Sequence, residues 1–176
     1  MSGVPKKVHV NVILHPAGSN PPFHFATTDL PLGPNNVLTF VNSGHPGFHV
    51  YYDLDDSQNP GYLFPDSPIP DHLGEALYSK PQAGCPNNKG QWGQFKALGV
   101  ENSGKTLLVH NRNQSIVNFG YTLRVTKDGG ASYLPLDPGG VNQNGPQRNF
   151  SLAVVLIVGA VVGSLLTIGA EALLQG

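Results

Sequence analysis

Charged residues, sulfur-containing residues and tryptophan are scarce in this sequence of 176 residues. Asp, Glu, Lys and Arg make up 12% of the chain, against about 25% in an ordinary soluble domain. The net charge of −1 provides no basic field for nucleic acid, so we expect no nucleic-acid partner. The single cysteine, Cys85, excludes an intrachain disulfide and suits a reducing compartment.

Signals of catalysis and of export are also lacking. The chain has no GxSxG nucleophile motif, and Cys85 stands in AGCPNN with no base beside it in sequence. We therefore expect a protein that is not an enzyme. The first residues, MSGVPKKVHVNVIL, lack the uninterrupted apolar run of a signal peptide.

Apolar and polar residues alternate over much of residues 1–134. The clearest case is VNFGYTLRV at 117–125, and similar runs occur at 8–14, 23–25, 36–42, 48–54 and 106–111. Alternation of this kind is typical of strands with one buried face. Clusters rich in Gly, Pro and Asn separate the runs. The pattern predicts a mainly β domain over 1–134, an antiparallel β-sandwich.

A connection rich in Pro and Gly interrupts this pattern over residues 55–100. We expect at most a short helix there, near Leu73–Tyr78. Connections of this length are usually functional or pack as compact loops. Its aromatic residues are either candidates for a protein interface or a cap on the open end of the sandwich: Tyr62, Phe64, Tyr78, Trp92 and Phe95.

The C-terminal part predicts a membrane anchor. Residues 135–149 form a polar linker rich in Pro and Gly, short enough to hold the domain near a bilayer. An uncharged run from Phe150 to Ala170 spans roughly 30 Å as a helix, and we expect a transmembrane helix at 150–172. Arg148 precedes it and no Lys or Arg follows, which predicts a cytoplasmic N-terminal domain. Because few residues follow, the segment resembles a tail anchor.

Small residues form a GxxxG pattern inside this predicted helix. Gly159 and Gly163, with Ala160 and Ser164 beside them, would lie on one face and allow a second helix to approach closely. The alternative is the ordinary glycine content of membrane helices. The run holds no His, Asp, Lys or Arg, so we expect an anchor or docking helix rather than a proton pathway.

The segment VLTFVNSGHPGFHVYYDL (Val37–Leu54) resembles the cupredoxin family, in which a strand ends at Asn and the next opens with a copper-ligating His. Those positions here are Asn42 and His49. The resemblance implies a Greek-key sandwich. The family's remaining ligands would be a Cys, a His and usually a Met around the last strand pair. This chain reads LLVHNRNQSIVNFGYTLRV there, without Cys or Met, so the resemblance implies the scaffold without its metal.

Two motifs leave alternative functions open. His49 and His110 fall within predicted strands, and with Cys85 they would form a copper or zinc site of three ligands if the fold brought them together. GVENSGKT at 99–106 matches the phosphate-binding pattern GxxxxGK[ST], which needs a strand before it and a helix after it. Strand-like alternation follows here instead, so a turn at Asn102–Gly104 explains the motif better.

Together these patterns predict a tail-anchored, single-pass accessory or structural subunit of a larger membrane complex, such as a respiratory or photosynthetic one. Its expected partners are the lipid bilayer and integral membrane subunits. A metal-binding or redox module of cupredoxin type is one alternative, and a nucleotide-binding protein that uses the GxxxxGKT motif is the other.

Overall fold

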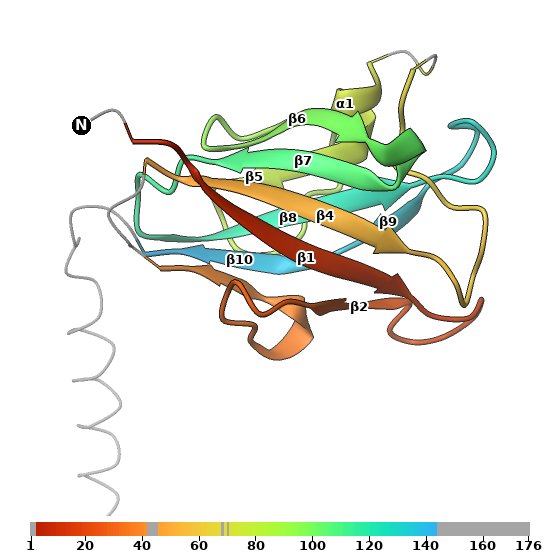
Figure 1. Ribbon diagram of the computed structural model, residues 1–176, viewed down its shortest axis with the longest axis horizontal. Helices are drawn as coiled ribbons and strands as arrows, with labels where there is room; N and C mark the ends of the chain where they lie inside the picture. Colours follow the sequence, from red (N-terminus) through yellow and green to blue (C-terminus); the bar gives the residue numbers. More distant parts are fainter. Residues whose placement is uncertain (1–2, 42–45, 68, 70, 144–176) are drawn as a thin grey trace, which may run out of the picture. The chain divides into compact units, whose positions relative to one another are not determined.

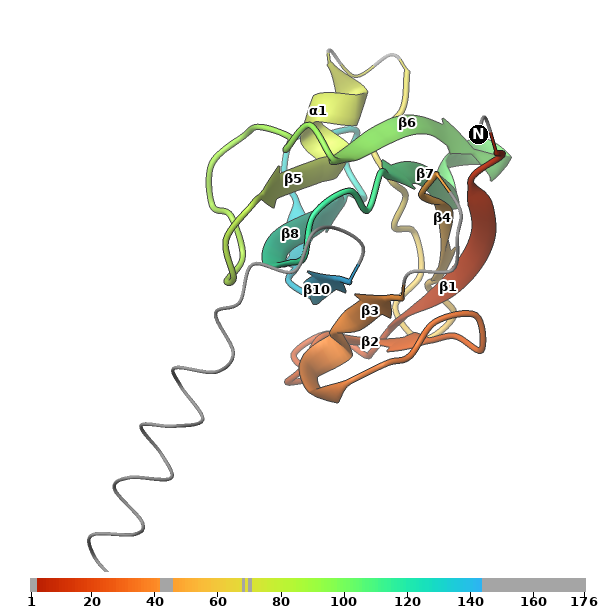
Figure 2. The same ribbon diagram turned by 90° about the vertical axis from the view of Figure 1, so that its left-hand side faces the viewer.

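Two β-sheets account for most of the ordered structure of this protein. The computed structural model describes residues 3–41, 46–67, 69 and 71–143, all of which belong to one compact unit that ends at Pro146. Figures 1 and 2 show the two sheets on opposite sides of a shared interior. The mainly β, sandwich-like prediction is therefore confirmed.

The first sheet has five strands in the order β2-β1-β4-β7-β6. Its strands are β1 (Lys6–Leu14), β2 (Phe23–Ala26), β4 (Phe48–Asp55), β6 (Phe95–Glu101) and β7 (Thr106–Asn111). The second sheet also has five strands, in the order β3-β10-β8-β5, with β9 paired to β8. These are β3 (Leu38–Phe40), β5 (Leu77–Lys80), β8 (Val117–Val125), β9 (Leu134–Leu136) and β10 (Gly139–Asn142).

Both sheets are mixed, so the expectation of a purely antiparallel sandwich is wrong. Strands β1 and β4 run parallel, as do β3 and β10, whereas the other pairs are antiparallel. Alternation of apolar and polar residues reports which face of a strand is buried. It does not report the direction of the neighbouring strand, because the period is two in both kinds of pairing.

Three short helical segments complete the described part of the chain: η1 (Pro34–Asn36), α1 (His72–Ala76) and η2 (Asn102–Gly104). The short helix expected near Leu73–Tyr78 therefore corresponds to α1, which Figures 1 and 2 show along the edge of the sandwich beside β5 and β6. The predicted connection at 55–100 is wrong in part, since it contains β5 and all of β6 except its last residue, Glu101. The predicted linker at 135–149 is wrong for residues 135–136, which belong to β9, and for residues 139–142, which form β10.

Inward-facing side chains of the two sheets form one hydrophobic core. In β1 every second residue from Val8 to Leu14 is fully buried, as the alternation predicts. Aromatic rings fill the middle of the core. The ring centroid of Phe95 lies 4.8 Å from those of Phe119 and Tyr121. Burial of this much apolar surface is the main contribution to the stability of such a domain.

Two polar pairs are enclosed in this core. The hydroxyl of Tyr52 donates to that of Tyr121 at 3.0 Å, and both side chains are fully buried. The amide groups of Asn111 and Asn142 exchange hydrogen bonds of 2.7 and 3.2 Å. Each pair joins a strand of the first sheet to a strand of the second, so the pairs fix how the two layers meet.

A loop after β5 lies directly on the second sheet. A Cβ atom on Gly120 of β8 would come within 1.7 Å of the carbonyl oxygen of Gly84, a distance that no side chain can adopt. Glycine at position 120 therefore permits this close approach of two backbones. The contact positions the loop that carries Cys85.

Among the residues that the structure describes, no helix has the length and apolar character needed to span a bilayer. The predicted transmembrane segment at 150–172 lies outside the described residues, as do its expected helix-packing residues: Gly159, Ala160, Gly163 and Ser164.

Candidate functional site

The structure brings two of the three predicted metal ligands together. His49 of β4 pairs directly with His110 of β7, and their ring centroids are 5.2 Å apart in an edge-to-face arrangement. Burial, with smaller effects of His49 and Arg112, lowers the pKa of His110. The Nε2 atom of His110 is buried without a hydrogen-bond partner among the described residues.

Positive charges flank this histidine pair on the exposed face of the sheet. Lys7 of β1 is paired with His49, and Lys96 of β6 is paired with His110. The strand register thus forms a row across four strands, Lys7–His49–His110–Lys96. Such a row repels metal cations and so weakens the case for a metal at this pair.

Cys85 lies apart from the histidine pair, in the loop that packs on the second sheet. Its Sγ atom donates to the carbonyl of Pro138 at 3.6 Å. Burial, with a smaller contribution from the negative charge of Asp137, raises the pKa of the Cys85 thiol to about 11. A thiol in this state is a poor metal ligand and a poor nucleophile at neutral pH.

The predicted three-ligand site of His49, His110 and Cys85 is therefore not assembled. The described part of the chain has no group of three His, Cys, Asp or Glu side chains placed to hold a metal ion. The physical reason is the division between layers: the histidines belong to the first sheet, and the contacts of Cys85 belong to the second.

The predicted interface aromatics divide into two groups. Phe64 and Phe95 have exposed fractions of 1% and 0%, so the expectation that they form an exposed interface is wrong. Tyr78 is buried as well, at 9%. Tyr62 and Trp92 are half-buried and pack against the core, which agrees with the alternative that the aromatics cover the sandwich.

The GxxxxGKT motif lies in a turn between two strands, as the favoured interpretation predicts. Strand β6 leads into η2, and β7 begins at Thr106. The Nζ atom of Lys105 donates to the carboxylate of Asp56 at 2.7 Å and to the carbonyl of Tyr62 at 2.8 Å. Because no helix follows the motif and its lysine already binds protein oxygens, the local structure does not match a phosphate-binding loop.

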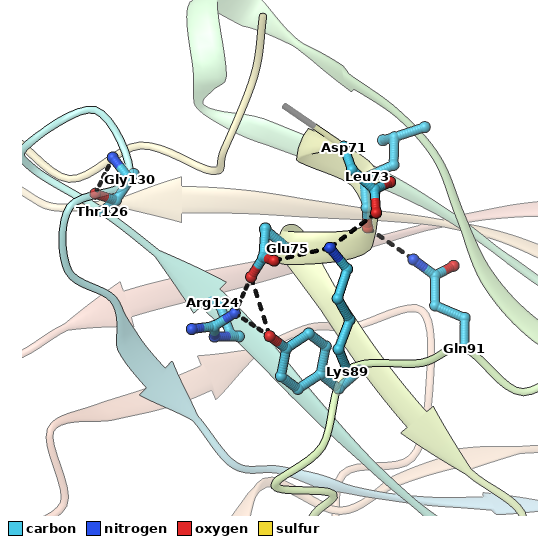
Figure 3. Close-up of polar contacts among 9 residues, drawn as sticks. Asp71, Leu73, Glu75, Lys89, Gln91, Arg124, Thr126 and Gly130 are labelled. Carbon is cyan, nitrogen blue, oxygen red and sulfur yellow. Dashed lines mark hydrogen bonds and ion pairs between the residues drawn. The ribbon is translucent and has the colours of Figure 1, made fainter. Parts of the chain in front are cut away.

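A polar cluster that sequence reasoning missed joins α1 to β8 (Figure 3). The carboxylate of Glu75 accepts hydrogen bonds from Lys89, Tyr78 and Arg124. Lys89 also forms an ion pair with Asp71, at 2.8 Å. Burial opposes ionisation of Glu75, but the three donors outweigh it, and the pKa of Glu75 lies below its ordinary value.

Aromatic rings hold the guanidinium group of Arg124 in this cluster. Its central carbon lies 4.6 Å from the ring centroid of Tyr78 and 4.0 Å from that of Tyr133. The side chain is only 18% exposed. Stacking on two rings and an ion pair with Glu75 fix the group in one orientation.

A cavity of about 280 Å³ lies beside Arg124. Ligand cavities usually have volumes of roughly 300–1,000 Å³, so this one is at the lower limit. Its lining offers aromatic and proline surfaces together with charges of both signs, from Tyr78, Pro86, Asn87, Thr122, Arg124, Tyr133, Pro135 and Asp137.

A second cavity, of about 330 Å³, lies at the η2 end of the sandwich. Leu63, Phe64 and Ile69 supply apolar surface there, and Ser103, Gly104 and Lys127 also line the cavity. The residues that line the two cavities include no histidine and no cysteine. Both cavities combine polar and charged groups with apolar surface.

Alternation could place Arg124 on the polar face of β8, but it could not identify Glu75 as its neighbour. Glu75 and Arg124 are 49 residues apart in sequence, and only the fold brings them into contact. No protein-family model and no curated protein matches this sequence.

Proposed function

We propose that this protein is a membrane-anchored, single-pass accessory subunit of a larger membrane complex and has no enzymatic activity. Its β-sandwich would pack on neighbouring subunits at the membrane surface. The bilayer and integral membrane proteins would be its partners. The module would face the cytoplasm, since Arg148 precedes the apolar run and no Lys or Arg follows it.

The observation that carries this proposal is the uncharged run from Phe150 to Ala170. A helix of that length matches the hydrocarbon thickness of a bilayer, and a charge-free run of this length is uncommon in a water-soluble domain. The compact unit ends at Pro146, so the run follows a domain that already has its own core.

The make-up of the described domain also supports a binding role. Its low content of charged residues is below that usual for a surface exposed wholly to water. Large apolar side chains are exposed on several elements, among them Leu63 at 39%, Leu98 at 47% and Ile116 at 45%. Partners that cover these side chains would remove apolar surface from water.

The finer description of the fold is part of the proposal. We infer a Greek-key sandwich of cupredoxin type without the family's metal. Its support is the resemblance of Val37–Leu54, where Phe48 and Val50 point into the core and His49 lies between them on the outer face. A scaffold of this kind, used for binding alone, is consistent with an accessory role.

The experiment is the native size of the full chain after extraction in a mild detergent. We expect migration in a complex far above the 18.7 kDa of the chain. Replacing the small residues in the double variant Gly159→Ile/Gly163→Ile should release the chain, because the added side chains prevent close helix approach.

The matched control is Val158→Ile/Val162→Ile, which adds bulk to other faces of the same predicted helix and should leave the complex intact. Migration of the wild-type chain as a monomer would contradict the proposed accessory role. Equal loss of the complex in both double variants would contradict packing through the glycine face.

A further inference from the structure

Two histidine side chains of the β1–β2 hairpin face each other through their ring nitrogens. His15 follows β1 directly and His24 lies within β2. The Nε2 atom of His15 is 2.6 Å from the Nδ1 atom of His24, and the ring centroids are 4.9 Å apart.

A backbone carbonyl sets the tautomer of one ring. The Nδ1 atom of His15 lies 2.9 Å from the carbonyl oxygen of Pro21, and a carbonyl can only accept. The proton of neutral His15 is therefore on Nδ1, and the lone pair on Nε2 points at His24. Donation of the second ring nitrogen to a carbonyl is the usual arrangement of a metal-ligating histidine.

The hairpin holds both rings in place. Strand pairing places Ile13 opposite His24 and Leu14 opposite Phe23, and the amide of His15 donates to the carbonyl of Pro22 at 2.9 Å. The backbone at both ligands is thus fixed before any ion arrives. His24 is exposed and His15 is half-buried, so an ion has access from solvent.

Charge distinguishes this pair from His49 and His110. Residues 14–26 include no Lys, Arg, Asp or Glu, whereas the other pair has Lys7 and Lys96 on its two sides. The buried Nε2 atom of His110 is also closed to solvent. A cation meets less repulsion and easier access at the hairpin.

We propose that His15 and His24 bind a divalent transition-metal ion such as Zn²⁺ or Cu²⁺, for which imidazole is a favoured ligand. The ion takes the lone pairs of His15 Nε2 and His24 Nδ1. The proton between them transfers to Nε2 of His24, so both rings remain neutral. Metal–nitrogen bonds of about 2.0–2.1 Å require the two nitrogens to move slightly apart, and water fills the other positions.

The test is calorimetric titration of Zn²⁺ into the full chain in mild detergent. The wild-type chain should bind one equivalent. His15→Ala and His24→Ala should each weaken binding by at least about tenfold, whereas the matched control His49→Ala/His110→Ala should bind as the wild type does. Nitrogen NMR of the histidine rings should show Zn²⁺ shifting His15 Nε2 and His24 Nδ1.

Three results would overturn this inference: no binding of Zn²⁺ by the wild-type chain, undiminished binding by His24→Ala, or loss of binding in the control variant alone. Fluorescence of Trp92, the only tryptophan, reports whether each variant retains its core. Because His24 is exposed on the surface, its substitution should leave the fold intact.

Discussion

The hydroxyl groups of Tyr52 and Tyr121 form a hydrogen bond with each other inside the core. Burial raises the pKa of both groups, so they remain protonated throughout the ordinary pH range. Tyr121→Phe leaves the Tyr52 hydroxyl buried without its acceptor, which should cost about 1–3 kcal/mol of unfolding free energy. Tyr52→Phe removes the donor to Tyr121 and should also destabilise the chain.

The double variant Tyr52→Phe/Tyr121→Phe should lose less stability than the sum of the two single variants, because it leaves no unpaired hydroxyl. Urea unfolding, followed by the fluorescence of Trp92, measures all four proteins. The ring of Trp92 lies 5.6 Å from that of Phe119 in the core. Additive losses would mean that the two hydroxyl groups do not interact.

Cys85 should react slowly despite its position in a loop. With a pKa of about 11, the thiol is almost entirely protonated at pH 8, and the thiolate is the reactive form. Alkylation by iodoacetamide at pH 8 should be at least about tenfold slower than that of a free thiol. Mass spectrometry against time measures the rate.

Asp137→Asn removes a negative charge that disfavours the thiolate, so this variant should react faster than the wild-type chain. Unfolding in urea should bring the thiol to the rate of an ordinary cysteine. Rapid alkylation of the folded wild-type chain at pH 8 would contradict the placement of Cys85 against Pro138 and Asp137.

At the scale of elements, the Glu75 cluster attaches α1 to β8. The depressed pKa of Glu75 means that its ionised form is favoured by folding. The stabilisation by ionised Glu75 is present above the ordinary glutamate pKa of 4.5. It is lost as the pH falls through the lower pKa of Glu75 in the folded state. The attachment of α1 should therefore weaken in acid and not at alkaline pH.

Glu75→Gln should destabilise the chain by about 1–3 kcal/mol at pH 7, because Arg124 loses its charged partner. The difference from the wild type should shrink as the pH falls below 4.5 and through the lower pKa of folded Glu75, because the carboxylate then becomes protonated. Urea unfolding at several pH values measures this. The control is Glu101→Gln, at an exposed position. An equal pH-dependent loss of stability in this control would contradict the stabilising role of Glu75.

The elements differ in how far the sequence could predict them. Strands β1 and β8 could be predicted because apolar residues recur at every second position, and nearly all of these are buried in the core. Strand β6 could not, since a bulge between Ala97 and Gly99 breaks its alternation. Strands β9 and β10 are short and contain Pro and Gly, residues that predict a linker in isolation.

At the scale of the whole molecule, contacts between segments distant in sequence decide which candidate site residues become neighbours, and the sequence alone could not predict those contacts. Alternation placed His49 and His110 on strands, but only the order of strands in the sheet makes them neighbours. Cys85 lies in a loop that packs on the second sheet, apart from both histidines. The facing nitrogens of His15 and His24 also required the hairpin geometry, although two histidines near a predicted turn gave a partial signal.

The anchoring of the molecule also belongs to this scale. The uncharged run from Phe150 to Ala170 should keep the full chain in the membrane fraction. An arginine at the centre of a transmembrane helix costs about 2.5–3.5 kcal/mol. The double variant Val158→Arg/Val161→Arg should therefore shift the chain toward the soluble fraction, while the control Val158→Ile/Val162→Ile should stay with the membranes.

The most direct measurement is the distribution of the full wild-type chain after cell lysis, high-speed centrifugation and washing of the membranes in alkaline carbonate, followed by immunoblotting. Our account predicts that the chain remains in the washed membrane pellet. Recovery of the wild-type chain in the supernatant would contradict it.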